Sequence, residues 1–365
     1  MNYVKLKDVC TINMGQSPSS DSYNENGHGV PFFQGNADFG ERYPVTRKWC
    51  STPTKMAAPE DILISVRAPI GAMNYAKEEC CIGRGLAALT PNREKVAPEY
   101  IFWLLKGKNE ELNCKGTGST FKAIGRNILE ETLVPNISLE KQTECAIILE
   151  KTYRVILSRK QQLQKLDELV KARFVEMFGD LVVGNKIKTN RHKIGDIAFV
   201  TKLAGFEFTK YVQYKECGDI IMLRGLNCKK GKLVLDDIKW IDKATSDLLP
   251  RSKLYYGDIL MTYAGTIGDV AMVDADDKYH LAPNVAKITL KEEAYNPIFL
   301  MHLFLYTNNY IMTFASKVAQ ASINMGKIRN LEYFFPDIDM QNWFATFVEQ
   351  VDKSKVVVQD EVNGL

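Results

Sequence analysis

The sequence lacks the features that would place the protein in a membrane, in a secreted compartment or among disordered chains. No apolar run approaches the roughly 18 residues that a membrane span needs. No apolar stretch follows the lysines near the N-terminus, as a secretory signal would require. Hydrophobic residues make up 45% and charged residues 25% of the chain, which is typical of globular proteins. We therefore expect a cytoplasmic protein with no membrane partner.

Disulfide and metal chemistry also have little support. The eight cysteines include no CxxC pair, the vicinal Cys80 and Cys81 do not bridge easily, and the four histidines lack metal-ligand spacing. We expect reduced, mostly buried thiols and no metal site. The net charge of +3 neither favours nor excludes a nucleic-acid partner, because binding follows the local field rather than the sum.

The motifs of an enzyme are missing too. No Gly-rich loop after a strand resembles a cofactor cradle or a P-loop. Amino-methyltransferases hold the target amine with an Asn/Asp-Pro-Pro-aromatic motif, and the nearest string here, Asn296–Phe299, lacks the second proline. The sequence therefore predicts a chain without catalytic residues and without a cofactor of its own.

What the sequence has is an internal repeat. Glu60–Gly71 (EDILISVRAPIG) matches Gly257–Gly268 (GDILMTYAGTIG), and Gly125–Pro135 matches Gly326–Pro336. The order is kept while the spacing between matched segments grows, which indicates two copies of one domain with loop insertions. At roughly 150 residues per domain the chain has room for two or three domains. The period far exceeds that of solenoid repeats, so each copy should hold its own core.

Each copy has the pattern of a mixed α/β domain. The DILISV and DILMTY segments have the apolar, β-branched character of strands. Tyr100–Lys106 and Pro297–Tyr306 are apolar on too many sides for surface helices, so we expect short helices buried against a sheet.

A long helix is predicted after each copy. Between Ser138 and Gly179, apolar residues recur in steps of three and four, and a similar run of about half that length begins near Met340. We expect the two helices to pair as an antiparallel coiled coil; the alternative is two separate helices, each packed on its own domain. The predicted pairing residues are Leu149, Tyr153, Ile156, Leu163, Val170, Phe174, Phe344, Phe347 and Val351.

This order of globular copy and long helix, given twice, resembles the DNA specificity subunit of type I restriction–modification systems. The helix entries that contain Gln142 and Gln341 are similar to the family's Pro-Leu-Glu-x-Gln entry. The resemblance implies an α+β fold with two tandem mixed α/β target-recognition domains, separated by long helices that pair as an antiparallel coiled coil. The expected divisions are 1–137 and 181–338 for the recognition domains, and 138–180 and 339–365 for the central and distal spacer helices.

The resemblance also implies a function. Each recognition domain would read one half of a bipartite, asymmetric site in double-stranded DNA, and the helices would dock two methyltransferase subunits. Restriction and translocase subunits would join this core, and S-adenosylmethionine, ATP and Mg would be held by the partner subunits. Two alternatives stay open: a recognition fragment of a fused restriction–methylase enzyme, and a scaffold that binds proteins and not DNA.

Candidate DNA-contacting residues lie where the two copies diverge. Arg suits guanine, Asn and Gln suit adenine, and Lys suits phosphate. The candidates are Gln34, Asn36, Arg67, Arg84, Lys122 and Arg126 in the first copy, and Arg224, Asn227, Lys229, Lys230, Tyr263, Asn284, Asn324 and Lys327 in the second. Tyr263 and Asn284 are approximate counterparts of Arg67 and Arg84. The alternative for the loops around Gln34 and Arg224 is a plain polar surface, and the basic stretch 186–193 either faces DNA or is a solvated linker.

Overall fold

The computed structural model describes residues 2–118, 122–187, 190–316 and 321–363. By its internal contacts the chain divides into two compact units, residues 1–157 and 158–365. The division falls inside helix α5 (Leu139–Phe178), so the domain limits predicted above stay predictions. Parts of three segments with predicted DNA contacts lie outside the described residues: 119–121 of the loop 116–122, 188–189 of the basic stretch 186–193, and 319–320 of the loop 319–324.

The described residues of the first unit form three β-sheets. The four-stranded antiparallel sheet has the order β2-β10-β7-β8, a five-stranded sheet has the order β3-β5-β4-β9-β6, and β1 pairs with β11. The strands are β1 (Tyr3–Lys5), β2 (Cys10–Met14), β3 (Tyr23–Asn24), β4 (Val30–Phe33), β5 (Trp49–Cys50), β6 (Met56–Ala57), β7 (Ile62–Ser65), β8 (Met73–Tyr75), β9 (Cys80–Ile82), β10 (Leu86–Pro91) and β11 (Leu133–Pro135).

The second unit repeats this topology. Its four-stranded sheet has the order β13-β22-β19-β20, a second sheet has the order β17-β14-β21-β18, and β12 pairs with β23. The hairpin β15-β16 is an addition of this unit. The strands are β12 (Arg191–Lys193), β13 (Ala198–Lys202), β14 (Ile220–Leu223), β15 (Cys228–Lys229), β16 (Lys232–Leu233), β17 (Lys239–Ile241), β18 (Lys253–Leu254), β19 (Ile259–Thr262), β20 (Val270–Met272), β21 (Tyr279–Leu281), β22 (Val285–Leu290) and β23 (Glu332–Phe334). The predicted duplication and α+β fold class are confirmed.

The helices follow the same repeat. Besides α5, the first unit has α1 (Leu6–Val9), α2 (Pro98–Gly107), α3 (Asn109–Cys114) and α4 (Arg126–Glu130). The second has α6 (Ile194–Ile197), α7 (Gly205–Tyr211), α8 (Lys243–Asp247), α9 (Pro297–Tyr306), α10 (Asn308–Thr313), α11 (Met325–Arg329) and α12 (Ile338–Asn363). In α9, Phe299, Leu300, Leu303 and Phe304 are fully buried, which confirms the predicted burial of this helix.

The repeated Asp-Ile-Leu motif has a structural role. Asp61 accepts hydrogen bonds from the backbone N–H of Ala58 (2.8 Å) and from the Thr90 hydroxyl (2.7 Å) on β10. Asp258 likewise accepts from the N–H of Tyr255 (2.9 Å) and from the hydroxyl of Thr289 on β22. Each carboxylate closes the turn before a central strand and ties that strand's start to its neighbour, so these buried acids are satisfied by hydrogen bonds within the fold.

The repeated glutamine at the helix entry, Gln142 or Gln341, is buried and links the long helix to the globular part; we call each one a glutamine joint. The Gln142 side chain accepts from the N–H of Ala97 (2.9 Å), before α2, and donates to the carbonyl of Ile137 (2.9 Å). The Gln341 side chain accepts from the N–H of Asn296 (3.0 Å), before α9, and donates to the carbonyl of Pro336 (2.8 Å). In each domain the amide therefore fixes where the long helix leaves the globular part.

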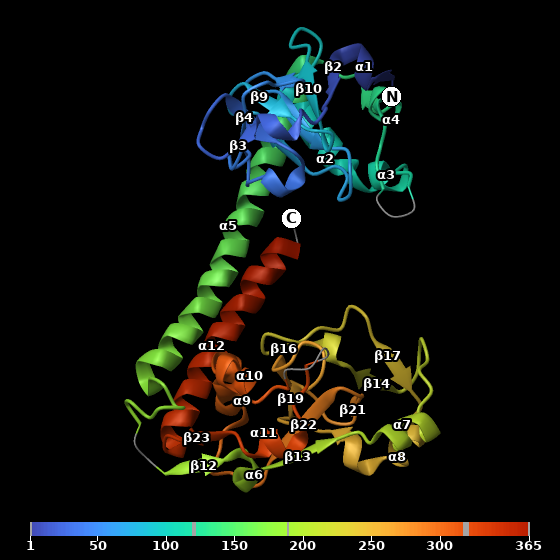
Figure 1. Ribbon diagram of the computed structural model, residues 1–365. Coiled ribbons are helices and arrows are strands. Elements are labelled where there is room, and N and C mark those ends of the chain that lie inside the picture. The colour runs from blue at the N-terminus through green and yellow to red at the C-terminus, as the bar shows by residue number, and fades with distance from the viewer. Residues whose placement is uncertain (1, 119–121, 188–189, 317–320, 364–365) are drawn as a thin grey trace. The chain divides into compact units, whose positions relative to one another are not determined.

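Within the second unit, α12 runs antiparallel to the C-terminal part of α5 (Figure 1). The Lys355 ammonium pairs with Asp167 at 2.7 Å, and the ring of Phe344 lies 5.3 Å from that of Phe174. Residue numbers therefore increase along α12 in the direction in which they decrease along α5. Gly179, with φ +66°, directly follows the last residue of α5 and ends the helix in the left-handed conformation that glycine adopts readily.

The predicted pairing residues divide along α5. Val170 and Phe174 are buried in one core with Phe344 and Val351, and Phe347 packs against that core. In the first unit, the ring of Tyr153 packs 5.1 Å from that of Trp103 of α2, and its assignment to the helix pair stays a prediction. Leu149 is 44% exposed. The physical reason is that α12 has 26 residues against the 40 of α5, and the start of α5 packs on its own domain. For Leu163 and Ile156, both half-buried, pairing stays a prediction.

Among the described helices, none is both long and apolar enough to cross a membrane.

Candidate nucleic-acid interface

Backbone hydrogen bonds bring three loops of the first domain together. The N–H of Val66 donates to the carbonyl of Gly85 (2.9 Å), and the N–H of Ile124 donates to the carbonyl of Val66 (2.9 Å). The N–H of Ala68 donates to the carbonyl of Lys122 (3.0 Å). As a result, the predicted Arg67, Arg84 and Lys122 lie on neighbouring loops, and all three side chains are exposed.

The loop that carries Gln34 joins the same end of the domain. β4 pairs in parallel with β9, so both strands end at the same edge of the sheet. The N–H of Gly85 donates to the carbonyl of Gln34 (3.2 Å), and the hydroxyl of Ser17 accepts from both the Gln34 side-chain amide (2.9 Å) and the N–H of Arg84 (3.3 Å). Gln34 and Arg84 therefore share a common anchor, Ser17, which carried no motif in the sequence.

A cleft of about 420 Å³ opens at these residues. Its walls combine amide, hydroxyl and charged side chains with two stacked aromatic rings, and the lining residues are Ser17, Tyr23, Phe32, Gln34, Asp38, Lys48 and Arg84. Tyr23 and Phe32 stack with ring centroids 4.7 Å apart. Burial raises the pKa of Tyr23, whose hydroxyl stays protonated and donates to the carbonyl of Pro18 (2.8 Å). These groups suit hydrogen bonding to base edges and phosphates.

The glycines beside Arg84 make this close approach possible. A Cβ at Gly83 would lie 3.0 Å from the Gln34 Cα and 3.0 Å from its side-chain oxygen. A Cβ at Gly85 would lie 2.5 Å from the Gln34 carbonyl oxygen. The Gly-Arg-Gly string is therefore fixed by contact with the Gln34 loop, which the sequence did not reveal.

The second domain assembles the same loops. The N–H of Tyr263 donates to the carbonyl of Asn284 (3.0 Å), and the N–H of Ile323 donates to the carbonyl of Tyr263 (2.9 Å). By these bonds Tyr263 is the counterpart of Val66, and Asn284 is the counterpart of Gly85. The approximate matches to Arg67 and Arg84 are therefore wrong by one residue, because side-chain chemistry and not backbone register had guided them. Asn284 remains exposed, with φ +68°.

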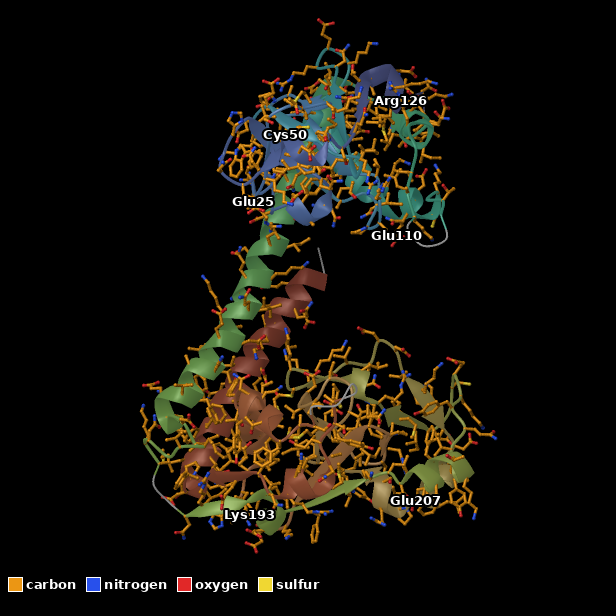
Figure 2. All side chains as sticks on the ribbon, viewed as in Figure 1. Glu25, Cys50, Glu110, Arg126, Lys193 and Glu207 are labelled. Atoms are coloured by element: carbon orange, nitrogen blue, oxygen red, sulfur yellow. The ribbon has the colours of Figure 1, made fainter. Side chains whose placement is uncertain are left out.

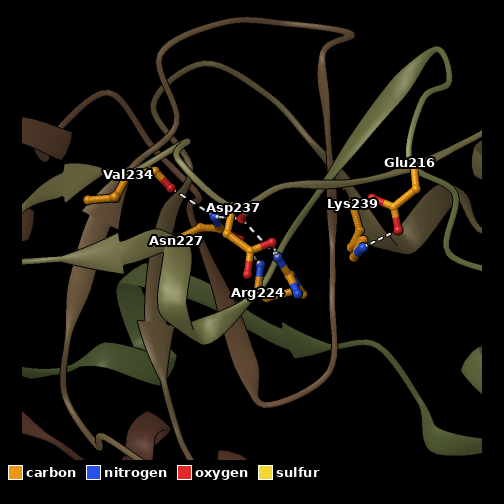
Figure 3. A network of polar contacts seen from close by, with 6 residues as sticks. All are labelled: Glu216, Arg224, Asn227, Val234, Asp237 and Lys239. Atoms are coloured by element: carbon orange, nitrogen blue, oxygen red, sulfur yellow. Dashed lines mark hydrogen bonds and ion pairs between the residues drawn. The ribbon is translucent and has the colours of Figure 1, made fainter. Parts of the chain in front are cut away.

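Arg224 follows β14 as Gln34 follows β4. Its Nη2 donates to the carboxylate of Asp237 (2.7 Å) and to the Asp237 carbonyl (2.8 Å), as Figure 3 shows. The Arg224 side chain is 19% exposed. A second ion pair, Lys239 with Glu216, lies beside this network (Figure 3). Asp237 had no sequence signal, since it lies in an irregular loop and only the fold brings it to Arg224.

The structure corrects the prediction for Asn227. Its side chain is fully buried, accepts from the N–H of Arg224 (3.0 Å), and donates to the carbonyls of Val234 (2.8 Å) and Asp237 (2.9 Å). With its amide satisfied inside the loop, Asn227 positions Arg224 and does not face a base. The sequence placed Asn227 beside Arg224 correctly, but the loop folds back over it.

The remaining candidates are spread over the two domains. Arg126, on the surface of α4 (Figure 2), pairs with Glu130 at 2.7 Å, and Asn36 is half-buried in a short turn. The Asn324 side chain caps α11 by accepting from the N–H of Lys327 (2.9 Å). Lys229 is an exposed residue of the β15-β16 hairpin. All four stay predictions for DNA contact.

Lys230 and Lys327 have defined surroundings. Lys230 lines a pocket with Asp167 of α5 and Met301 of α9, beside the paired helices. The Lys327 ammonium donates to the carbonyl of Phe314 (2.7 Å). Contact between these two lysines and DNA also remains a prediction.

Several titratable groups are buried inside the two domains. Burial raises the pKa of Cys10, Cys80 and Cys228 to about 12, and the buried Cys50 lies inside the first domain (Figure 2). Burial lowers the pKa of His302 to about 4, and its ring is hydrogen-bonded to the carbonyl of Ile298 at 2.8 Å. Within the described residues, no three His, Cys, Asp or Glu side chains gather closely enough to hold a metal ion.

The duplicated fold and its paired loops define a class of two-domain recognition proteins, and comparison gives the family. The chain belongs to the family described as the type I restriction modification DNA specificity domain, whose sequence profile matches residues 1–168 and again 188–361.

Individual relatives agree with this assignment. The chain is 20% identical over 397 residues to the EcoBI specificity subunit of Escherichia coli, covering 99% of this chain and 81% of that one. It is 41% identical over 160 residues to a sequence assigned as the MjaX specificity subunit of Methanocaldococcus jannaschii, which is 44% of this chain and 38% of that relative. The chain thus spans less than half the length of the MjaX relative. The type I S subunit of M. genitalium shows the same fold, with TM-score 0.57, 11% identity, and coverage of 100% of this chain and 92% of that one.

Proposed function

We propose that this chain is the sequence-specific DNA-binding subunit of a type I restriction–modification complex. Each recognition domain reads one half of a bipartite, asymmetric site. The observation that carries the proposal is the repeated scaffold with different loop side chains: Gln34 and Arg84 in one domain, Arg224 and Tyr263 in the other. Two similar scaffolds with different polar side chains on their loops suit a site whose halves differ in sequence.

The partners follow from the same proposal. The long helices dock two methyltransferase subunits, which bring S-adenosylmethionine and methylate an adenine in each half-site after flipping it from the duplex. Restriction and translocase subunits complete the complex with ATP and Mg, and this chain supplies recognition without catalysis. The complex works on chromosomal DNA in the cytoplasm.

Co-expression with the partner methyltransferase subunit tests the proposal. N6-methyladenine is mapped across the host genome with and without this gene. A two-part motif with a fixed gap, lost when the gene is deleted, is the expected result. Methylation unchanged by the deletion contradicts the proposal, and methyl transfer by the purified chain alone would favour the fused-enzyme alternative.

A second experiment separates DNA recognition from protein scaffolding. Affinity of the complex for a duplex carrying the mapped motif should fall steeply between low and moderate salt, because phosphate contacts release counterions. DNA binding that does not depend on salt, or no DNA binding at all, favours the protein-scaffold alternative.

Removing seven residues from within 149–177 should change the gap between the half-sites. An unchanged gap shows that α5 does not set it.

A further inference from the structure

Gln34 and Arg224 occupy the same backbone position in the two domains. Each is the first residue after a strand that pairs in parallel, β4 with β9 and β14 with β21. The carbonyl just before each residue accepts an equivalent hydrogen bond, from Gly83 to Phe33 (2.8 Å) and from Ala282 to Leu223 (3.2 Å). The backbone around this position is therefore alike in the two domains, and the side chain differs.

The turn that follows is also shared. The N–H of Gln34 donates to the carboxylate of Asp38 (2.8 Å), and the N–H of Arg224 donates to the side-chain oxygen of Asn227 (3.0 Å). In both domains the acceptor is the last residue of a 3₁₀ turn, at 36–38 and 225–227. Both loops therefore hold the backbone of their first residue with a side-chain oxygen three or four residues further on, and a fixed backbone is part of the pre-organisation that base reading needs.

In the first domain the side chain is an exposed carboxamide. One Nε2–H of Gln34 is engaged by the Ser17 hydroxyl (2.9 Å). An amide has a second N–H and an acceptor oxygen, and this pair matches the N7 acceptor and N6 donor of adenine. The contact with Gly83 limits the positions available to the amide oxygen.

In the second domain the side chain is a guanidinium held by a carboxylate. Asp237 engages only Nη2 of Arg224. The Nε atom is buried and, within the described residues, has no hydrogen-bond partner. A guanidinium carries five N–H donors in a rigid fork. Two of them, on Nη2, are engaged by Asp237 and the one on Nε is buried, so the two donors on Nη1 remain for the O6 and N7 acceptors of guanine while Asp237 fixes the plane of the fork.

We infer that positions 34 and 224 are equivalent base-reading positions, with Gln34 selecting adenine in one half-site and Arg224 selecting guanine in the other. The inference rests on the proposed function and deepens it, because it names the residue and the base. One scaffold can then read two different sequences, because the side chain at this position differs between the domains while the strand end, the turn and the backbone hydrogen bonds are the same.

The first test uses the complex of the full chain with its methyltransferase subunit and a pool of duplexes with randomised base pairs. Gln34→Glu keeps the size of the side chain and replaces the amide donor with an acceptor, which suits the N4 donor of cytosine. Ser17 can donate to the new carboxylate, so the anchor is kept. We expect adenine to be replaced by cytosine at one base pair of one half-site, with the other half-site unchanged.

The second test uses Arg224→Lys in the same selection. Lysine keeps the charge but lacks the planar fork, so a phosphate contact survives and a bidentate guanine contact does not. We expect a loss of about 10- to 100-fold in guanine preference at one base pair of the other half-site. A matched control is Arg251→Lys, which is exposed and outside the loops and should leave the motif unchanged.

The outcomes separate this inference from the proposed function. A wild-type complex that selects no motif overturns both. A wild-type bipartite motif that neither substitution changes, or that both change in the same half-site, overturns the inference alone. Uniform weakening across all sequences by variants that melt like wild type places the two residues on phosphate and also overturns it.

Discussion

In the first domain the residue after β4 is an exposed glutamine anchored by Ser17, and in the second the residue after β14 is an arginine held by Asp237. Around both, the sheets have corresponding strand orders and the same parallel strand pair. The difference shows that the scaffold tolerates a change of side chain at this position when the loop supplies a matching partner: a hydroxyl for an amide, a carboxylate for a guanidinium. The long helices of the two repeats also differ, both in length and in how much equivalent residues contribute to stability.

The largest expected difference concerns Phe344 and Cys145, which stand at the same distance after the joint glutamines. Phe344 is fully buried against Phe174 and Phe178, whereas Cys145 is exposed. Phe344→Ala should destabilise the second domain by about 3–5 kcal/mol through lost packing and a cavity. Cys145→Ala should have almost no effect. Hydrogen exchange of the full chain, resolved by domain, measures both; equal effects would contradict the asymmetry.

The next comparison is between His302 on α9 and Trp103 on α2, equivalent positions of the repeat. The pKa of His302, about 4, lies below its ordinary 6.5 because the ring is buried, while Asp167 and Asp352 raise it and Lys355 lowers it. The unfolded state binds the extra proton, so the stabilisation is present above about pH 6.5 and is lost as the pH falls towards 4. This loss amounts to at most about 3 kcal/mol.

Domain-resolved hydrogen exchange at pH 7 and pH 5, corrected for intrinsic rates, measures this effect. The second domain should lose protection at pH 5, and His302→Leu should reduce that loss. The first domain, with Trp103 at this position, is the internal control. An equal loss in both domains would assign the acid sensitivity to groups other than His302.

The glutamine joints should behave alike in the two domains. Gln142→Ala leaves the N–H of Ala97 without its partner, and Gln341→Ala does the same to the N–H of Asn296. An unpaired buried N–H costs about 1–3 kcal/mol, so each variant should weaken its own domain by that amount. Thermal melting combined with exchange at the start of each helix measures it. An effect in only one domain would show that the two joints are not equivalent.

The smallest effect is expected for Lys355, which has Ile156 at the equivalent position of α5. Lys355 pairs with Asp167 (2.7 Å) and Asp352 (2.9 Å), and both carboxylates are more than half exposed. Because solvent screens such pairs, Lys355→Met should cost no more than about 1 kcal/mol. The matched control, Lys353→Met, lies on an exposed face of α12. A much larger loss would mean that the ion pairs fix the register of the helices.

Much of the architecture was predictable because repetition is visible in sequence. The matching Asp-Ile-Leu segments predicted strands that became β7 and β19, and the apolar steps near Val170 predicted the helix pair. Local pattern did not identify every packing partner. Tyr153 has the spacing of a seam residue, but its ring packs against Trp103 of its own domain.

The candidate interface was predictable as a set of loops but not as contacts. Arg84, Gln34 and Arg224 were found because their chemistry suits bases and the copies diverge there. Ser17, Lys48 and Asp237 were missed, since nothing in their local sequence distinguishes them from other surface residues. Asn227 was misread because amide chemistry alone does not tell whether the group faces a base or satisfies its own loop.

The sequence by itself determined the duplication, the family and the type of each main element, since apolar periodicity and repeated motifs act over short distances along the chain. Tertiary structure decided the rest. It placed Gln34 and Arg224 at one equivalent position, buried Asn227, and gave Arg224 its carboxylate from Asp237. These outcomes depend on hydrogen bonds between segments far apart in sequence, and such bonds form only once the sheets have brought the loops to one edge.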